Sequence, residues 1–588
     1  MVYGLPVVGA AEVRVTSVKL ERPVIELFER GELTIRLEGL VADPYDANEL
    51  LLEATFHPPR GPAVTVPAFY YQPFEPSDEA PGQARPVGEP VWKVRLTPRE
   101  KGVWSYEVTL RTPAGKSAAA SGTMEVIASA RPGFVQLDRA SQSFRFERGE
   151  TFIPIGENMC WPPSAQPLAA YARWMRDLAQ QRANYIRLWL APWAFRLETK
   201  DTGVGRYDQL RAWQVDQLLE QSESAGLYWQ LSLLEHGSFS QTHDPAWQGN
   251  PYNQDLGGMC RTPNDFVTDS KAQAAFQRLL RYLVSRWGYS PHLATWELFN
   301  ELDLSDIRME DATPWVAQMS AYLRSIDPYR RPITISVHHE QAEAIWRLPT
   351  IDTIQVHAYD QRDFAGFFGG SFITELKQRF QKPVLVGEFG WIGEFMRQVD
   401  TGGIHLHDGL WASALGGAMG GALPWFWDTY IHPNHLERHD RALAMFWRGE
   451  QIRQPLQRLS LSLSDPDLFG CGVGTSNHAY VWFKNRTHNV DQYLAYRAAV
   501  AKERLRQARG QTPTLVAYPP RIIEQATATI RGLAWMGRYR IEWWDTYRGQ
   551  VASRSVASVW GGALTVPVPA VEFDVAAKVV KLQWWERG

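Results

Sequence analysis

The sequence predicts an α/β protein built around a (β/α)8 TIM barrel with a β-sandwich domain on either side. From about residue 150, eight short apolar runs alternate with amphipathic stretches, a pattern typical of repeated β/α units. Before and after this region, short strand-like runs lie between Pro- and Gly-rich turns. The length of 588 residues exceeds what one hydrophobic core usually serves. We therefore expect domains at 1–127, 128–457 and 458–588.

The first domain is expected to be a small β-sandwich. Residues 33–39, 49–56, 91–96 and 102–110 alternate in polarity or are rich in β-branched and aromatic side chains. Turns rich in proline and glycine separate them, and this spacing is typical of a sandwich. Residues 136–152 indicate a hairpin or an entry segment to the barrel.

The barrel strands are expected at eight apolar runs. These are 152–156, 185–190, 228–234, 294–300, 333–337, 353–359, 383–389 and 422–428. The clearest helix between them is 271–287, where apolar residues recur at helical spacing. The interval between the fifth and sixth runs is short, so the helix there has the weakest support. Eight units over roughly 300 residues suit a TIM barrel with insertions.

The last part of the chain returns to strand-like sequence. Residues 479–484, 514–518, 539–545 and 579–585 predict a second small sandwich. Residues 491–512 form a helix-like basic insertion, which we expect to be a solvated surface face.

Composition narrows the possible functions. The formal net charge of −3 does not indicate a nucleic-acid partner, and without an apolar run of 18 residues no membrane partner is expected. The three cysteines are widely separated, so neither a disulfide framework nor a metal site is expected. The first residues lack the features of a signal peptide, so we expect a cytoplasmic protein, or a secreted one with its signal removed. The oligomeric state stays open.

The most informative feature is a pair of glutamates that close two apolar runs. Glu301 ends the run WELFNE, and Glu388 lies in VLVGEFG. In a TIM barrel the strand ends point at the active site. Glycosidic bond cleavage needs two carboxyl groups there, one to give a proton and one to attack carbon or to activate water. The pair therefore predicts a glycosidase.

Polar and aromatic residues occupy the other expected strand ends, more of them than a purely structural barrel needs. They are Glu157, Asn158, Arg187, Glu235, His236, Asn300, Ser336, His338, His357, Tyr359, Trp425 and Trp427. For His236 and His338, a structural hydrogen bond is about as good an interpretation as a substrate contact.

This set resembles the clan of retaining β-glycosidases that includes the family 5 cellulases and β-mannanases. The clan places an Asn-Glu pair at strand four and a nucleophilic Glu at strand seven, which Asn300-Glu301 and Glu388 match. Further matches are Arg187, His236, His357, Tyr359 and Trp425, although LLEHG around His236 departs from the usual context. The resemblance covers roughly residues 150–455. The first 127 residues resemble a β-sandwich often found before such barrels in bacterial enzymes.

The resemblance implies a retaining β-glycoside hydrolase that cleaves a β-linked polysaccharide or oligosaccharide by double displacement. Glu388 would be the nucleophile, kept ionised by Arg187 and hydrogen-bonded by Tyr359. Glu301 would be the acid and then the base, its pKa raised by the neighbouring carboxylate. No cofactor and no metal are implied, and the expected partner is a carbohydrate.

The same resemblance implies the sugar contacts. Asn300 would bind the 2-hydroxyl, and Trp425 would form the floor under the reacting ring, with Trp427 competing for that role. The expected substrate-binding set is Arg187, His236, Asn300, His357, Tyr359, Trp425 and Trp427. Glucan- and mannan-like substrates are the commonest among similar barrels. The alternatives are a transglycosylase, an exo-acting β-galactosidase or arabinofuranosidase, and a non-catalytic carbohydrate-binding barrel.

Overall fold

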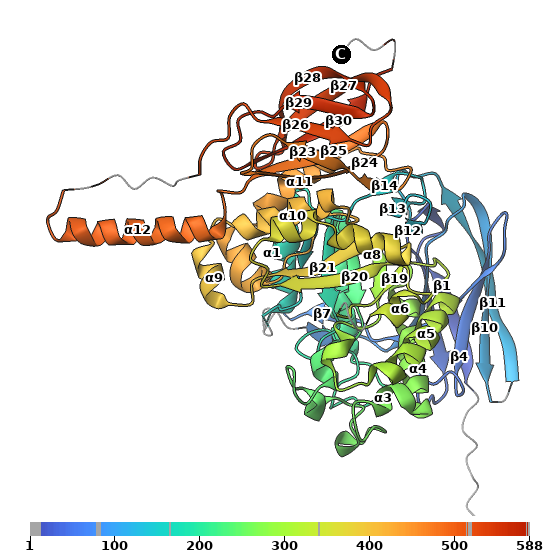
Figure 1. Cartoon of the computed structure of the whole chain (residues 1–588). Coiled ribbons are helices and arrows are strands. Elements are labelled where there is room, and N and C mark those ends of the chain that lie inside the picture. Colours follow the sequence, from blue (N-terminus) through green and yellow to red (C-terminus); the bar gives the residue numbers. More distant parts are fainter. Residues whose placement is uncertain are drawn as a thin grey trace, which may run out of the picture.

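The computed structural model describes residues 13–77, 84–113, 115–163, 166–338, 342–512, 514, 520–583 and 585. A central barrel has a strand-rich N-terminal region on one side and a C-terminal sheet above it (Figure 1). Within the described residues, no helix is long and apolar enough to span a membrane.

Two sheets that share one hydrophobic core make up most of the N-terminal region. Their strands are β1 (Arg14–Leu20), β2 (Val24–Glu26), β3 (Gly31–Glu38), β4 (Leu51–His57), β5 (Val64–Pro67), β6 (Phe69–Tyr71), β9 (Val91–Leu96), β10 (Gly102–Thr112) and β11 (Gly115–Ile127). The strand orders are β1-β3-β9-β6 and β2-β11-β10-β4-β5. The four predicted strands are confirmed as β3, β4, β9 and β10. In β10 every second residue from Trp104 to Leu110 is buried, as expected of a strand with one face on the core. A short hairpin, β7 (Phe74–Pro76) and β8 (Ala84–Pro86), lies beside them.

A small antiparallel sheet closes the bottom of the barrel. It contains β12 (Val135–Asp138), β13 (Ser143–Phe146) and β14 (Thr151–Phe152), which confirms the hairpin predicted at 136–152. Phe144 and Phe152 pack against Tyr185 and Tyr228, which begin two barrel strands. The first barrel strand predicted at 152–156 is therefore wrong, because Phe152 pairs within this sheet.

The barrel wall consists of parallel strands. They are β15 (Gly156–Asn158), β16 (Tyr185–Trp189), β17 (Tyr228–Ser232), β18 (Leu293–Glu297), β19 (Ile333–Thr334), β20 (Ile354–Tyr359) and β21 (Val384–Gly390). β15 to β19 form one five-stranded sheet, and β20 pairs with β21. A single bridge between Ser336 and Gln355 joins the two groups.

The eighth position of the wall is closed by backbone hydrogen bonds rather than by a regular strand. Leu423 donates to the carbonyl of Val386 at 3.0 Å, and on the other side Asn158 donates to the carbonyl of Pro424 at 3.3 Å. The second half of the strand predicted at 422–428 is wrong, because the chain enters a π-helix, η5 (Trp427–Ile431).

Helices connect the strands around the outside. The main ones are α1 (Pro167–Gln180), α2 (Gln209–Ala225), α4 (Ser270–Trp287), α5 (Met309–Ile326), α6 (Glu343–Trp346), α8 (Phe372–Phe380), α10 (Ile404–Gly416) and α11 (Arg438–Trp447). α4 confirms the helix predicted at 271–287. It starts where it does because the Asp269 side chain accepts hydrogen bonds from the backbone of Lys271 and Ala272. Among the described residues of the short fifth interval, the one helix is the four-residue α6.

The C-terminal region contains one continuous nine-stranded sheet, so the separation into two sheets that a sandwich requires is not confirmed. Its order is β22-β24-β25-β30-β27-β28-β29-β26-β23. The strands are β22 (Gln457–Arg458), β23 (Ser460–Leu463), β24 (Leu468–Gly474), β25 (His478–Asn485), β26 (Thr527–Arg531), β27 (Met536–Asp545), β28 (Gln550–Trp560), β29 (Ala563–Pro567) and β30 (Asp574–Lys581). The edge strands β22 and β23 are one residue apart in sequence, so the sheet curls into a barrel-like form. The strand predicted at 514–518 lies mostly outside the described residues.

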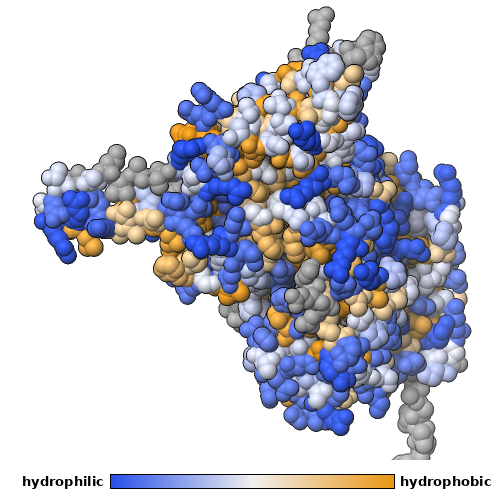
Figure 2. All heavy atoms as spheres, in the orientation of Figure 1, coloured by the Kyte–Doolittle hydropathy of each residue, from blue (hydrophilic) through white to orange (hydrophobic). Residues whose placement is uncertain are grey.

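The basic insertion forms a helix, α12 (Val490–Ala508), as predicted. It projects away from the body beside the short helix α9 (Glu394–Val399) (Figure 1). Its visible surface carries hydrophilic and hydrophobic residues together (Figure 2).

Candidate active site

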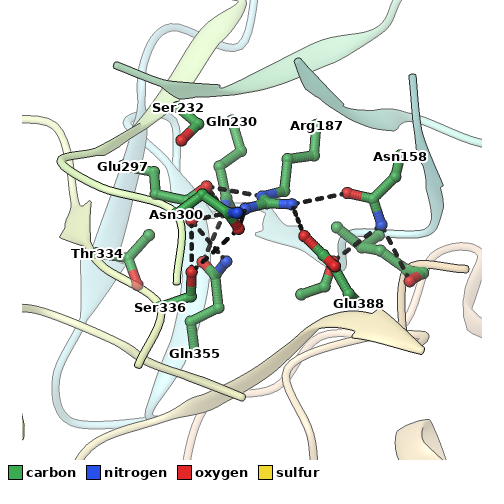
Figure 3. Close-up of polar contacts among 12 residues, drawn as sticks. Asn158, Arg187, Gln230, Ser232, Glu297, Asn300, Thr334, Ser336, Gln355 and Glu388 are labelled. Atoms are coloured by element: carbon green, nitrogen blue, oxygen red, sulfur yellow. Dashed lines mark hydrogen bonds and ion pairs between the residues drawn. The ribbon is translucent and has the colours of Figure 1, made fainter. Parts of the chain in front are cut away.

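Buried polar side chains from neighbouring barrel strands meet inside the mouth (Figure 3). They include Arg187 of β16, Gln230 of β17, Glu297 of β18, Gln355 of β20 and Glu388 of β21, all of which are buried. Successive residues of a strand point to opposite faces, and these five side chains point to the inner face, toward one another (Figure 3). An arginine and two carboxylates in one interior make a charged site there.

Arg187 is the hub of this site. Its Nη1 donates to Glu388 at 2.5 Å and to Asn158 at 3.0 Å, and its Nη2 donates to Asn300 at 2.6 Å. Its Nε and Nη2 also donate to the two oxygens of Glu297 at 2.7 and 2.8 Å. The guanidinium therefore holds the carboxylate of Glu388 and the amide of Asn300 in fixed positions.

The two predicted glutamates face one another. A carboxylate oxygen of Glu301 and one of Glu388 lie within 4.8 Å of each other, and the Nδ1 of His357 lies 2.8 Å from Glu301 and 3.5 Å from Glu388. Retaining glycosidases hold their carboxyl groups about 5–5.5 Å apart, and inverting ones about 6.5–9.5 Å apart. The observed spacing suits retention. Tyr359 donates its hydroxyl to the second oxygen of Glu388.

Glu301 has a left-handed backbone with φ of 50°, which is uncommon for a residue with a side chain. The Ser336 hydroxyl accepts a hydrogen bond from its amide at 2.8 Å. The Nδ1 of His357 lies 2.8 Å from its carboxylate, and the Nδ1 of His236 lies 3.5 Å from the other oxygen. Backbone strain of this kind is held in place by the surrounding structure and aims the side chain at the cleft.

The expected sugar platforms separate in the structure. Trp425 is partly exposed at the mouth, and its ring centroid lies 5.2 Å from that of Trp189. Trp427 is only 2% exposed and packs against Trp174 and His432, so its expected place on the cleft floor is wrong. Because the chain turns helical at Trp427, the two tryptophans do not share a strand face.

The side chains of three other expected mouth residues pair with groups other than the two glutamates. Glu157 is buried next to Asp440 of α11, since it points outward where its neighbour Asn158 points inward. Glu235 accepts from the backbone of Ser238 and caps a short helical turn. His338 is exposed and pairs with Asp303, Nδ1 to carboxylate oxygen at 2.5 Å.

Sequence reasoning did not single out Glu297, Gln230 and Gln355. Each is a polar residue inside an otherwise apolar strand run, and that interruption is the signal that could have found them. Gln230 and Gln355 both donate to Glu297 at 2.9 Å. Together the three form the floor beneath Arg187.

Comparison with known proteins agrees with this geometry. Residues 139–398 match the cellulase family, glycosyl hydrolase family 5. This match identifies a family 5 domain within the barrel. Residues 24–111 match DUF5060, a domain of unknown function. The family 5 barrel is that of a retaining glycoside hydrolase, as predicted.

Curated relatives of the family 5 barrel carry mannosidase names. One is "Putative mannan endo-1,4-beta-mannosidase 9" of Oryza sativa subsp. japonica, 24% identical over a match that covers 49% of this chain and 81% of that protein. Another is mannan endo-1,4-beta-mannosidase F of Aspergillus fumigatus, 26% identical over 31% of this chain and 42% of its own length. A crystal structure of a Bacteroides vulgatus protein has the same fold, with a TM-score of 0.57, 14% identity, and coverage of 95% of this chain and all of the other.

The two glutamates of the site have pKa values shifted in opposite directions. Burial raises the pKa of Glu301, but the hydrogen bond and charge of His357, with His236 and Arg187, lower it to about 2. Burial raises the pKa of Glu388, and the charges of His357 and Arg187 do not reverse this. The expectation that the opposite charge of Arg187 keeps the pKa of Glu388 low is therefore wrong. The expectation that the neighbouring carboxylate raises the pKa of Glu301 is likewise wrong, because the His357 hydrogen bond and the nearby positive charges outweigh burial.

The surface of the barrel is hollowed beside Trp425. A hollow of about 740 Å³ lies there, lined by Trp161, Glu394, Arg397, Trp425, Asp428 and Asn434. Trp161 is 45% exposed and stacks on Trp193, with ring centroids 3.9 Å apart. Aromatic faces beside polar groups suit sugar rings, which present C–H surfaces and hydroxyls.

Glu301, His357 and Glu388 could in geometry also hold a metal ion. Arg187 already places a positive charge 2.5 Å from Glu388, which disfavours a cation there. The contacts suit acid–base chemistry better than metal binding.

Proposed function

We propose that this protein hydrolyses internal β-1,4-mannosidic bonds with retention of anomeric configuration. The observation that carries the proposal is the pair of carboxyl oxygens of Glu301 and Glu388 within 4.8 Å at the mouth of a family 5 barrel. The mannosidase names of the curated relatives support the choice of sugar.

In the proposed first step, Glu388 attacks the anomeric carbon while protonated Glu301 gives its proton to the leaving oxygen. The product is a glycosyl ester on Glu388. In the second step, Glu301 takes a proton from water, the water attacks the same carbon, and the ester bond breaks. Tyr359 supports Glu388 through both steps as a neutral donor, since burial raises the pKa of its hydroxyl well above the usual value.

The proposed sugar contacts follow from the same geometry. Asn300, fixed by Arg187 at 2.6 Å, is suited to bind the 2-hydroxyl. Trp425 is suited to be the floor under the reacting ring. His236, 3.3 Å from the Asn300 amide, and His357 would complete the polar wall. The hollow beyond Trp425 supports endo action, because it leaves room for a further sugar unit on that side.

Product analysis tests the proposal. Linear β-mannan and defined manno-oligosaccharides should give short oligosaccharides early in the reaction, and proton NMR should record the β-anomer first. Release of mannose alone would favour exo action, and elongated products would favour a transglycosylase. Glucan, galactoside and arabinofuranoside panels run in parallel check the sugar. No turnover of any glycoside by folded protein would instead support a non-catalytic carbohydrate-binding barrel.

We also propose that the chain divides into domains near residues 127 and 457, with the first domain a β-sandwich. Two sheets around one core support this for the N-terminal part. Limited proteolysis followed by mass spectrometry would locate the boundaries.

A further inference from the structure

Glu297 is a buried carboxylate at the end of β18 to which the double displacement gives no role. The side chains of Glu297 and Arg187 are 0% exposed, and that of Glu388 is 2% exposed. Arg187 donates to both oxygens of Glu297 at 2.7 and 2.8 Å, and to Glu388 at 2.5 Å. One guanidinium therefore serves two buried carboxylates.

Neutral donors hold Glu297 in this position (Figure 3). Gln230 donates to one oxygen at 2.9 Å, and Gln355 and Ser336 donate to the other at 2.9 and 3.2 Å. With the two bonds from Arg187, these contacts use the acceptor capacity of an ionised carboxylate. Gln230 and Gln355 are 0% exposed and Ser336 is 1% exposed, so these contacts are shielded from solvent.

The charge of Glu388 changes during the proposed reaction, whereas that of Arg187 does not. When Glu388 bonds to the anomeric carbon, the glycosidic bond breaks and the leaving oxygen takes the proton of Glu301. Glu388 is then a neutral ester, and the guanidinium keeps its charge because arginine is not deprotonated in proteins. A buried cation without a counter-ion is strongly unfavourable.

We infer that Glu297 is a positioning residue. It remains the counter-ion of Arg187 when Glu388 is esterified. While Glu388 is an ionised carboxylate, Glu297 shares the positive charge of Arg187 with it. The inference rests on the proposed roles of Glu388 and Glu301. Without Glu297, the whole positive charge of Arg187 would act on Glu388. The ionised carboxylate of Glu388 would then be more stable and would attack the anomeric carbon more slowly. Glu297 thus balances the free and esterified states of Glu388.

Glu297→Gln tests this inference, with Glu297→Asp as the matched variant that keeps the charge. In Glu297→Gln the acidic limb of kcat/KM should move down by about one pH unit, because the undivided charge lowers the pKa of Glu388. Trapping by a 2-deoxy-2-fluoro-β-mannosyl fluoride should slow about tenfold, the factor that one pKa unit represents. Glu297→Asp should keep the wild-type limb. An unshifted limb and unchanged trapping in Glu297→Gln would overturn the inference.

Glu388→Gln supplies a second measurement that needs neither activity nor a stable Glu297 variant. It imitates the neutral charge state of the ester. If Glu297 is the standing counter-ion, the midpoint of thermal unfolding stays within about 2 °C of wild type or rises, because Arg187 remains paired. A larger fall would overturn the inference. If the fluoro sugar does not label Glu388 in wild-type protein, the proposed function is refuted. The unfolding measurement does not depend on that labelling and tests the role of Glu297 separately.

Discussion

At the residue scale, the proposed catalysis depends on where one proton lies between two buried carboxyl groups. His357 is placed to control it, with its Nδ1 2.8 Å from Glu301 and 3.5 Å from Glu388. Arg187 and Tyr359 bind only Glu388 of the pair, which makes the two carboxyl groups unequal. The unequal surroundings assign different roles to two chemically identical side chains.

Glu388→Ala and Glu301→Ala should respond differently to added anions. Glu388→Ala should lose activity, and azide or formate should restore turnover with inverted product, because the small anion can attack from the vacated space. Glu301→Ala should keep its first step on aryl mannosides with good leaving groups, since these need no proton. Rates with both substrate types and NMR of the products measure this. The same anion and leaving-group response in both variants would contradict the assignment.

His357→Ala should move the whole pH profile of kcat/KM to higher pH. His357 lowers the pKa of Glu301 by a hydrogen bond and by charge, and its charge also lowers the pKa of Glu388. Without it both values rise, so the acidic and alkaline limbs both shift upward, in addition to a loss of activity. The control is His478→Ala, an exposed histidine of the C-terminal sheet. If the acidic and alkaline limbs of the pH profile do not shift in His357→Ala, His357 does not control the pKa values of Glu301 and Glu388.

At the element scale, β15 and α11 meet through a pair of buried acids. Glu157 of β15 and Asp440 of α11 are 1% and 0% exposed. Burial raises the pKa of Asp440 to about 7. Burial also raises the pKa of Glu157 well above its usual value, and the charge of Asp440 raises it further. Both groups therefore favour the protonated form when folded. This packing contact is tolerated only while at least one of them carries a proton.

Asp440→Asn should make the protein more stable at alkaline pH. Because the folded pKa of Asp440 lies above its unfolded value, the contribution of this group to stability is fully present below about pH 4 and is lost as the pH rises through about 7. The asparagine does not titrate, so at pH 8 its free energy of unfolding should exceed that of wild type by about 2–4 kcal/mol. Urea unfolding from pH 4 to 9 measures this, with the exposed Asp201→Asn as control. Parallel pH curves for wild type and Asp440→Asn would contradict it.

At the scale of the whole molecule, a buried ionic network joins the N-terminal sheets to the barrel. Arg95 of β9 donates to Glu32 at 2.7 Å and to Asp216 of α2 at 2.9 Å. Asp216 also pairs with Arg286 of α4 at 2.7 Å. One aspartate therefore compensates two buried arginines from two different parts of the chain, and the N-terminal region is fixed against the barrel.

Asp216→Asn should destabilise the protein by about 3–5 kcal/mol, because it leaves Arg286 buried without a carboxylate partner. Chemical unfolding followed by circular dichroism measures the loss. The matched control is Asp491→Asn, which breaks an exposed pair with Arg362 and should change stability little. An equally small change in both variants would show that the network does not hold the two regions together.

Local patterns predicted much of this architecture. Alternation in β10 and helical spacing in α4 are properties of neighbouring residues, and both elements are where the sequence indicated. The first and eighth barrel strands could not be located in this way. The wall there is closed by backbone hydrogen bonds from Leu423 and Asn158 to distant partners, and no local pattern encodes those.

By itself, the sequence determined the fold class of the barrel and the two glutamates, because strand ends are local features and a TIM barrel gathers them at one face. Only the tertiary structure decided which side chains share the site. It moved Trp427 into the core, turned Glu157 outward, and brought Glu297 to Arg187 at 2.7 Å. The physical reason is that a buried charge takes its role from partners more than a hundred residues away, and their distance and direction exist only once the barrel has closed.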